Sequence, residues 1–234
     1  MVDCGLSCRE TEKRMKACDI DPDAISAVLF THNHSDHCKG VGTFRKRHPQ
    51  IPFYANGGTA EAIAAVTGVQ DGWVVFETAE PFEIGAFTIT SFSIPHDAAD
   101  PVGYLFDDGT SRFVLCTDCG MPTLAVKDAL SRATCAMLES NHDSVLLQTS
   151  GRAPSLIQRI AGRCGHLSNA DAADLVREVA PRGLTTLLLA HLSEECNAPH
   201  LAEEAMRTAL CDVGRPQTIL AALRQHEPSD LYTF

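Results

Sequence analysis

Runs of apolar residues separated by polar breaks divide the chain into short helices and strands. Helical spacing of apolar positions predicts helices over 9–18, 39–48, 59–66, 121–132, 156–163, 168–179 and 199–210. Short apolar runs predict strands at 25–30, 52–55, 73–76, 87–94, 102–106, 112–117, 184–190 and 217–223. The segment Asp107-Asp-Gly-Thr lies between two of these strands and is typical of a hairpin turn. The pattern predicts a single α/β domain over residues 1–234, with antiparallel sheet in its middle.

Composition and charge exclude several classes of protein. The chain has 19 Lys and Arg against 30 Asp and Glu, and the formal net charge of −11 argues against a wide basic face for nucleic acid. The small basic cluster Arg45–His48 is more typical of a solvated helix end than of a DNA contact. No apolar run approaches the ~20 residues of a membrane helix, so no membrane partner is expected. The first residues include Asp3 and lack the apolar stretch of a secretory signal, so a cytoplasmic location is expected.

The ten cysteines are expected to be reduced thiols, because nothing marks the chain as secreted. Cys116 and Cys119 have the spacing of a zinc or redox pair. No second pair with this spacing follows, so we expect both to be small core residues.

The strongest chemical signal is a cluster of imidazoles and a carboxylate directly after the apolar run 25–30. The cluster consists of His32, His34, Asp36 and His37. Neutral imidazole and carboxylate are the usual ligands of zinc and related divalent ions. Residues 32 and 34 alternate and can face the same way in an extended turn, whereas Asp36 and His37 belong to the next bend and can face a second ion. The cluster therefore predicts a metal site.

The pattern His32-x-His34-x-Asp36-His37 resembles the main motif of the metallo-β-lactamase superfamily. Further segments resemble its WalJ/YycJ branch, bacterial cytoplasmic proteins related to RNase Z and to the phosphoribosyl cyclic phosphodiesterases. These segments are GLSC, THNHSDHCKGV, IPHDAADPVGY, LESNHD, GHLSNADAA and LLLAHLSEECNAP, which together span nearly the whole chain. The resemblance implies a four-layer αβ/βα sandwich, two metal ions and phosphodiester chemistry.

The resemblance also implies which residues hold the two ions. The superfamily requires a His, an Asp and a His after the main motif, and His96, Asp118 and His191 end apolar strands in that order. Zinc, manganese and iron all suit such ligands. The implied arrangement places His32, His34 and His96 on one ion, Asp36, His37 and His191 on the other, and Asp118 between the two.

The same resemblance assigns roles around the metals. His166, in GHLSN, matches the histidine that RNase Z-like enzymes direct at the scissile phosphate, and we expect it to be catalytic together with Asp36. Asp3 is expected to fix the ligand loop by hydrogen bonds. Other residues expected to line the cleft or contact substrate are Glu139, Asn141 and His142.

These assignments predict a metal-dependent hydrolase in which a hydroxide held by two ions ~3.5–4 Å apart attacks phosphorus. Its activity should fall below about pH 6, as the histidine ligands take up protons. A nuclease is favoured, with a 5′→3′ exonuclease on single-stranded DNA or RNA as the specific expectation. A small-molecule cyclic phosphodiesterase, a glyoxalase- or lactonase-type hydrolase and a non-catalytic metal-binding protein are the alternatives.

The sequence departs from the family pattern at its start. Relatives usually begin with two strands and a Gly/Ser-rich loop ahead of the VDCG-like segment, whereas this sequence begins at Met1-Val2-Asp3. We therefore expect the N-terminal strands of the sandwich to be missing. An uncovered sheet edge allows pairing with another chain, so a homodimer is also expected.

Overall fold

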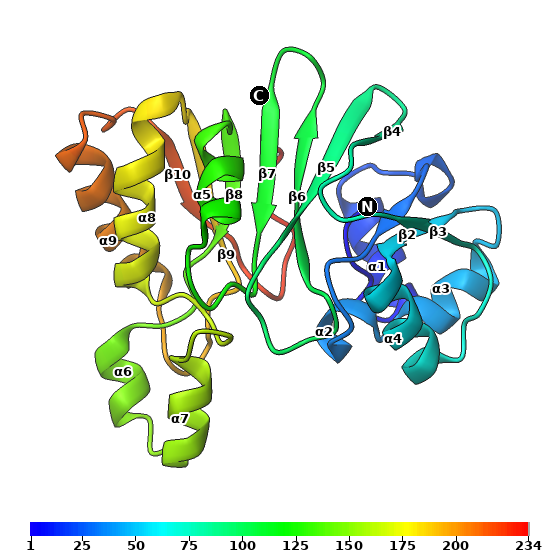
Figure 1. Ribbon diagram of the computed structural model, residues 1–234, viewed down its shortest axis with the longest axis horizontal. Helices are drawn as coiled ribbons and strands as arrows, with labels where there is room; N and C mark the ends of the chain where they lie inside the picture. The colour runs from blue at the N-terminus through cyan, green and yellow to red at the C-terminus, as the bar shows by residue number, and fades with distance from the viewer. Residues whose placement is uncertain (234) are drawn as a thin grey trace. The chain divides into compact units, whose positions relative to one another are not determined.

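The computed structural model describes residues 1–233 and forms two compact units (Figure 1). Unit 1 comprises Met1–Ser91, Ala98–Val102 and His226–Pro228. Unit 2 comprises Phe92–Asp97, Gly103–Gln225 and a short C-terminal stretch. The chain thus passes between the units several times, and the single domain expected over residues 1–234 stays a prediction.

Unit 1 is built on a three-stranded parallel sheet. Its order is β1-β2-β3, and the strands are β1 (Val28–Leu29), β2 (Phe53–Asn56) and β3 (Trp73–Phe76). The core packs Phe30 against Phe53 and Trp73, with ring centroids 5.4 and 5.5 Å away. The other elements of this unit are α1 (Cys8–Ala17), η1 (Pro22–Ala24), α2 (Ser35–Cys38), α3 (Val41–Arg47), α4 (Gly57–Thr67), and the antiparallel pair β4 (Phe82–Ile84) and β5 (Phe87–Ser93), whose last residues enter unit 2.

Local signals explain where the unit 1 helices begin and end. The Ser7 side chain caps α1 by accepting a hydrogen bond from the Glu10 backbone N–H, and Asn56 caps α4 through Thr59 N–H. Gly68 ends α4 with a φ of 75°, a left-handed conformation that glycine adopts without steric cost. These caps fix the short segments that lead from each strand into the following helix.

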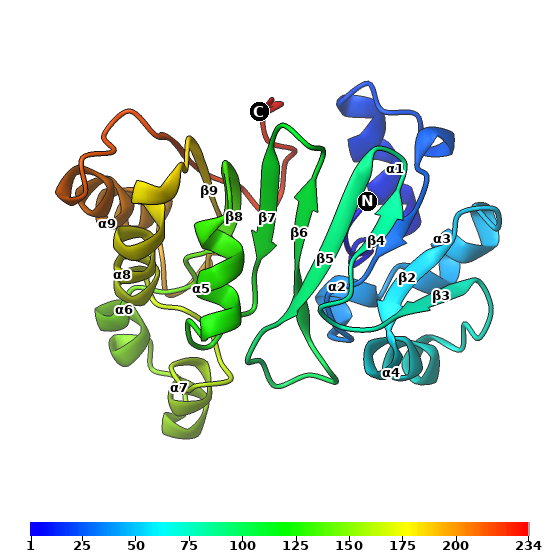
Figure 2. The same cartoon turned by 45° about the horizontal axis from the view of Figure 1, so that its top comes forward.

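Unit 2 is built on a mostly parallel sheet with helices on it (Figure 2). Parallel pairing joins β7 (Arg112–Cys116), β8 (Cys135–Glu139), β9 (Thr186–Ala190) and β10 (Ile219–Ala222). The strand β6 (Val102–Asp107) is antiparallel to β7. The helices are α5 (Leu124–Ser131), α6 (Ser144–Thr149), α7 (Pro154–Ile160), α8 (Asn169–Val179) and α9 (Pro199–Asp212), with the 3-10 turn η2 (Ala180–Arg182) after α8.

The apolar sides of α5, α8 and α9 cover this sheet and form the core of unit 2. Val126, Leu175 and Met206, one from each helix, are buried together with Leu138 and Leu187 of the sheet. Since β7, β8 and β9 are parallel, their carboxyl ends meet at one edge of the sheet. Glu139 is the last residue of β8, and Asp118 and His191 follow the ends of β7 and β9, so all three belong to this edge.

Most predicted elements are present, and the differences have physical causes. The strand predicted at 25–30 is reduced to Val28–Leu29, because only these two residues are in register with β2, opposite Phe53 and Tyr54. Asp36 and His37, predicted to lie in a bend, instead lie in the short helix α2, Ser35–Cys38. The prediction missed β4, β8 and α6. The strand β8 (CAMLE) is short and has no alternating pattern, because it is covered on both faces.

Two further predictions concern cysteines and membranes. Cys116 and Cys119 are both buried in the apolar core of unit 2, as expected for small core residues. Within residues 1–233, no helix is long and apolar enough to cross a membrane.

Candidate metal centre

The first part of the candidate site is the turn that follows β1 in unit 1. The chain leaves β1 at Phe30, and His34 occupies the N-cap position of α2. Asp36 and His37 are the second and third residues of α2. The rings of His34 and His37 lie beside that of His32, with centroids 4.7 and 4.1 Å away. The turn therefore gathers three imidazoles in one place.

Asp3 holds this turn from the N-terminal segment. Its Oδ1 accepts a hydrogen bond from the Thr31 backbone N–H at 2.8 Å. Its Oδ2 accepts from Thr31 Oγ1 at 2.9 Å and lies 2.7 Å from His37 Nδ1. Because a carboxylate only accepts, His37 carries its hydrogen on Nδ1. Thr31 Oγ1 in turn lies 3.0 Å from His32 Nδ1 and serves as its acceptor.

The N-terminal segment packs directly against the metal motif. Cys4 donates its backbone N–H to the carbonyl of His37 at 2.7 Å. A Cβ atom on Gly5 would come within 1.4 Å of the Asp36 carbonyl oxygen, so only glycine fits at this position. Asp36 itself is exposed, and its Oδ2 lies 3.6 Å from His37 Nε2.

The second part of the candidate site lies at the carboxyl edge of the unit 2 sheet. Asp118, directly after β7, is buried, and its Oδ1 lies 3.4 Å from His191 Nε2. The same oxygen lies 3.8 Å from His96 Nε2 and 3.9 Å from His166 Nδ1. Three histidines from separate segments thus surround one buried carboxylate.

Glu139, the last residue of β8, anchors two of these histidines. It is fully buried, and its Oε1 lies 2.7 Å from His191 Nδ1 and 2.9 Å from His166 Nδ1. Its Oε2 accepts the backbone N–H groups of Cys119 and Leu167 at 2.9 and 3.0 Å. Burial alone would raise the pKa of Glu139, but the hydrogen bonds from the two histidines outweigh burial and hold the pKa below its ordinary value. Glu139 is therefore a carboxylate with four hydrogen-bond donors.

Several histidines show the hydrogen-bonding pattern of metal ligands. Metal-binding histidines usually donate one ring N–H to a carboxylate, carbonyl or other acceptor, which leaves the other nitrogen for the ion. In unit 1 the acceptor is Asp3 for His37 and Thr31 for His32. In unit 2 they are Glu139 for His191 and the Gly165 carbonyl, 3.2 Å from Nδ1, for His96. The other ring nitrogen is Nε2, which in His37 lies 3.6 Å from Asp36 and in His191 and His96 lies 3.4 and 3.8 Å from Asp118. Imidazole nitrogens grouped with carboxylates in this way are a donor set that suits divalent cations.

Three of the predicted residues have strained backbones. Asp3, Asp118 and His191 have φ values of 56°, 58° and 56°, in the left-handed region that residues other than glycine seldom adopt. Such conformations persist only where surrounding contacts enforce them, and they gather at functional sites. For His191 one such contact is visible, because Asn141 Nδ2 donates to the His191 carbonyl at 2.8 Å.

His142 lies just beyond this network and is also buried. Its carbonyl accepts the Asn169 backbone N–H at 2.8 Å, which joins it to the start of α8. Among residues 1–233, no hydrogen-bond partner is found for its Nδ1. Burial lowers the pKa of His142 from its ordinary value of 6.5, so the neutral form is favoured.

Each unit therefore gathers the predicted residues that belong to it. Within unit 1 these are Asp3, His32, His34, Asp36 and His37. Within unit 2, Asp118, Glu139, His166 and His191 present ligand atoms within 4.8 Å of one another, and His96 joins them through Asp118. The roles assigned to these residues stay predictions.

Sequence reasoning missed two residues, Thr31 and Asn197, that make hydrogen bonds around the site. Thr31, directly before the motif, was not singled out, although its position next to His32 was a signal. Asn197 was also missed, and its Nδ2 donates to the carbonyls of Ser140 and Asn141.

The side chains of the basic cluster Arg45–His48 are engaged by carboxylates of the same unit. Arg45 pairs with Asp71 at 2.9 Å, and Glu12 lies 2.9 Å from Arg47 and 3.0 Å from His48.

Comparisons with known proteins agree on one family. The model of a family described as beta-lactamase superfamily domain matches residues 1–192. The exodeoxyribonuclease YycJ of Bacillus anthracis is 34% identical over 217 residues, which cover 92% of this chain and 81% of that protein. The exodeoxyribonuclease WalJ of Streptococcus pneumoniae is 33% identical over 220 residues, with the same shares covered. Among solved structures, the metallo-β-lactamase fold protein YhfI of Bacillus subtilis matches with a TM-score of 0.66 and 18% identity, covering 95% of this chain and 83% of that one.

Proposed function

Since this chain belongs to the metallo-β-lactamase superfamily, in the branch of YycJ and WalJ, we propose that it is a metal-dependent exodeoxyribonuclease. The predicted metallo-β-lactamase fold, an α/β fold, is confirmed by the solved relative. The chain is a hydrolase of this superfamily, as predicted. The proposal adds the substrate, single-stranded DNA, and the direction, from the 5′ end.

One observation carries the proposal. Four predicted ligands, two in each unit, have their Nδ1 atoms held by an acceptor, which orients each ring so that Nε2 would be the ligand atom. We infer that His32, His34 and His96 hold one divalent ion, that Asp36, His37 and His191 hold a second, and that Asp118 is shared. When bound, such ions activate water and neutralise charge on phosphate oxygens. Zinc, manganese and iron suit this set of nitrogen and oxygen donors.

We propose that His166 takes part in proton transfer at the scissile phosphate. Its Nδ1 donates to the buried carboxylate of Glu139, which fixes the orientation of the ring. With the ring held in this way, Nε2 is the atom through which His166 would pass a proton to the leaving oxygen of the scissile phosphate. The same carboxylate orients His191, so Glu139 positions a proton donor and a metal ligand together.

Identity to nucleases favours DNA over the other expected substrates. The two relatives at 33–34% identity are both exodeoxyribonucleases, and each match covers 92% of this chain. The ESNHD and GHLSN segments supply Glu139 and His166, which are the residues we assign to phosphodiester cleavage. No observation specifically favours a cyclic phosphodiesterase, a thioester or lactone hydrolase, or a homodimer.

The test is hydrolysis by the purified chain loaded with zinc or manganese. We expect it to shorten 5′-phosphorylated single-stranded DNA from the 5′ end and to cleave the small diester bis(p-nitrophenyl) phosphate. Asp118→Ala should abolish both activities, because it removes the carboxylate that the two ions would share. The matched control is Asp128→Ala, an exposed carboxylate on α5 of the same unit, which should retain both.

The outcomes separate the alternatives. Cleavage of the small diester without cleavage of DNA would contradict the nuclease proposal and favour a small phosphodiester substrate. An Asp118→Ala variant as active as the parent would contradict the metal-dependent mechanism itself.

A further inference from the structure

A segment of unit 2 has a charge pattern opposite to that of the chain. The whole sequence carries a net charge of −11, with Asp and Glu spread along it. From Ser144 to Ala170 there is no Asp or Glu, whereas Arg152, Arg159, Arg163 and His166 all lie there. Arg152 pairs with Glu195 at 2.7 Å and is largely covered, so Arg159 and Arg163 are the arginines of this stretch that an anion could reach.

This stretch forms a projecting pair of helices. In both ribbon views α6 and α7 stand away from the sheet of unit 2, beyond the ends of α5 and α8 (Figures 1 and 2). We refer to residues 144–165 as the α6–α7 arm. Its helices are short, and among their residues only Leu147 is buried. An arm held by so little core packing leaves most of its surface for contact with another molecule.

The arm leads directly into the catalytic edge of unit 2. The His166 backbone N–H donates to the Ile160 carbonyl at 2.8 Å, so the end of α7 is tied to the proposed proton donor. The Gly165 carbonyl accepts from His96 Nδ1. A Cβ atom on Gly120 would come within 2.4 Å of the Arg163 carbonyl oxygen, so the backbone at Arg163 packs against the loop that follows Asp118. Any polymer reaching His166 and Asp118 passes close to this part of the arm.

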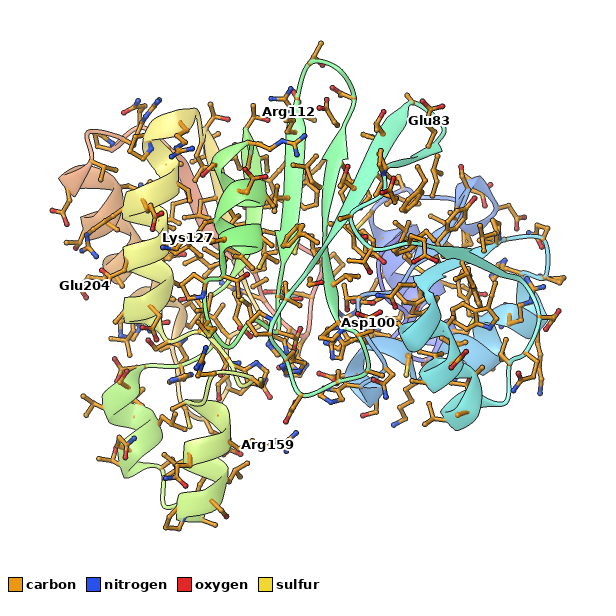
Figure 3. The ribbon with its side chains drawn as sticks, in the orientation of Figure 1. Glu83, Asp100, Arg112, Lys127, Arg159 and Glu204 are labelled. Atoms are coloured by element: carbon orange, nitrogen blue, oxygen red, sulfur yellow. The ribbon has the colours of Figure 1, made fainter. Side chains whose placement is uncertain are left out.

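Two arginines on this part of the arm are exposed and weakly engaged. Arg159 extends from α7 toward the loop after β5, where its Nε lies 2.6 Å from Asp97 Oδ2 (Figure 3). Its side chain remains 62% exposed, and ion pairs of this kind add little stability. Arg163 is exposed, and its Nε contacts the Met121 thioether at 3.2 Å, a weak acceptor. Both guanidinium groups can therefore bind phosphate oxygens in a bidentate manner.

Exposed apolar side chains lie on the arm and at the start of α5. Val145, Leu146 and Leu156 of the arm are 69, 38 and 37% exposed, and Leu124 at the start of α5 is 87% exposed. Proteins that bind single-stranded nucleic acid combine cationic groups for the phosphates with side chains, most often aromatic, that contact the unpaired bases. The arm has cationic and exposed aliphatic side chains and no carboxylate or aromatic residue.

We propose that the α6–α7 arm is the surface on which single-stranded DNA lies, with Arg159 and Arg163 binding the phosphates next to the scissile bond. This inference rests on the proposed nuclease function and adds the path of the substrate. It assigns a function to residues that take no part in metal binding or proton transfer. It also explains how a chain with a large negative net charge can hold a polyanion.

The test measures DNA and a small diester in parallel. For Arg159→Gln, Arg163→Gln and the double variant, we expect the KM for single-stranded DNA to rise about tenfold per arginine, since each removes a charge-assisted contact. The loss in kcat/KM should be at least about tenfold greater for DNA than for bis(p-nitrophenyl) phosphate, which is too short to reach along the arm. The matched control is Arg182→Gln, an exposed arginine in η2 of the same unit, which should behave as the parent with both substrates.

Binding at different salt concentrations gives a second readout that does not depend on turnover. In the inactive Asp118→Ala background, the slope of log K against log salt should fall by about 0.7 per arginine, or about 1.4 for the double variant, because each phosphate contact releases counterions. If the double variant bound DNA with the parent slope and affinity, the arm proposal would be wrong even though the chain is a nuclease. If the parent cleaved the small diester but neither bound nor cleaved DNA, the proposed nuclease function would fail together with the arm.

Discussion

At the scale of single residues, Glu139 organises the unit 2 half of the site. It is fully buried with four donors around it, from His166, His191, Cys119 and Leu167. A buried carboxylate is stable only when it is so fully hydrogen-bonded. Its cost in desolvation is offset by contacts that fix two imidazoles, so its position serves the chemistry of the site more than the packing of the core.

Asp3 has the equivalent role in unit 1, where it fixes His37. Both residues were predicted from the resemblance to a family, not from their spacing along the sequence. The contact of Asp3 with His37 spans the chain from residue 3 to residue 37, and that of Glu139 with His191 spans a longer separation. No local pattern encodes such pairs, because they exist only once the strands are aligned.

His142 gives a prediction on pH dependence. Burial lowers its pKa below 6.5, so between the folded-state pKa and 6.5 the unfolded chain binds a proton that the folded chain does not. Stability therefore rises with pH through this window and is lost as the pH falls below about 6.5. In metal-free protein, His142→Gln should flatten the dependence of Tm on pH between about 7.5 and 5.5.

The control for this prediction is His200→Gln, an exposed histidine on α9, which should keep the parent slope. A His142→Gln variant whose Tm fell as steeply with acid as that of the parent would show that this histidine does not contribute to acid sensitivity.

At the scale of elements, the sequence predicted the helices with clear signals best. The pattern Ser168-Asn-Ala-Asp predicted the start of α8, and Ser168 Oγ does accept the Asp171 backbone N–H at 3.1 Å. The strand at 73–76 was predicted with its exact bounds. By contrast β8 was missed, because a strand covered on both faces lacks the alternation that marks a strand. Its absence from the prediction also hid the sheet edge on which Glu139 lies.

The packing of the N-terminal segment on α2 gives a prediction at this scale. Gly5→Ala would place a Cβ atom 1.4 Å from the Asp36 carbonyl oxygen, a backbone atom that cannot move without shifting α2. We expect a loss of about 1–3 kcal/mol in the free energy of unfolding, together with weaker metal binding, because α2 carries Asp36 and His37. Chemical denaturation and metal titration measure these two effects.

The matched control is Gly57→Ala at the start of α4. A Cβ atom there meets nothing within 4 Å, so this variant should be as stable as the parent or more stable by a few tenths of a kcal/mol. Equal stability of the Gly5→Ala and Gly57→Ala variants would show that the N-terminal segment does not support the metal motif.

At the scale of the whole molecule, the order of ligands along the chain was predictable and their joint geometry was not. The main motif and three later residues at strand ends were recognised in order, since strand ends in layered α/β folds collect ligands. Each unit gathers its own share of these residues around hydrogen-bonded histidines. We propose that the ligand residues of both units hold the same two ions.

The most direct test of this central claim is the metal content of four purified proteins, measured by elemental analysis after equilibration with zinc. These are the parent, His37→Ala from unit 1, His191→Ala from unit 2, and the double variant. Because His37 and His191 are proposed to hold the same ion, the parent should bind about two ions per chain, and each single variant about one. The double variant should lose no more than either single variant, since coupled residues are not additive. A double variant that loses the sum of the two single losses, or a single variant that keeps the metal content of the parent, would contradict the account.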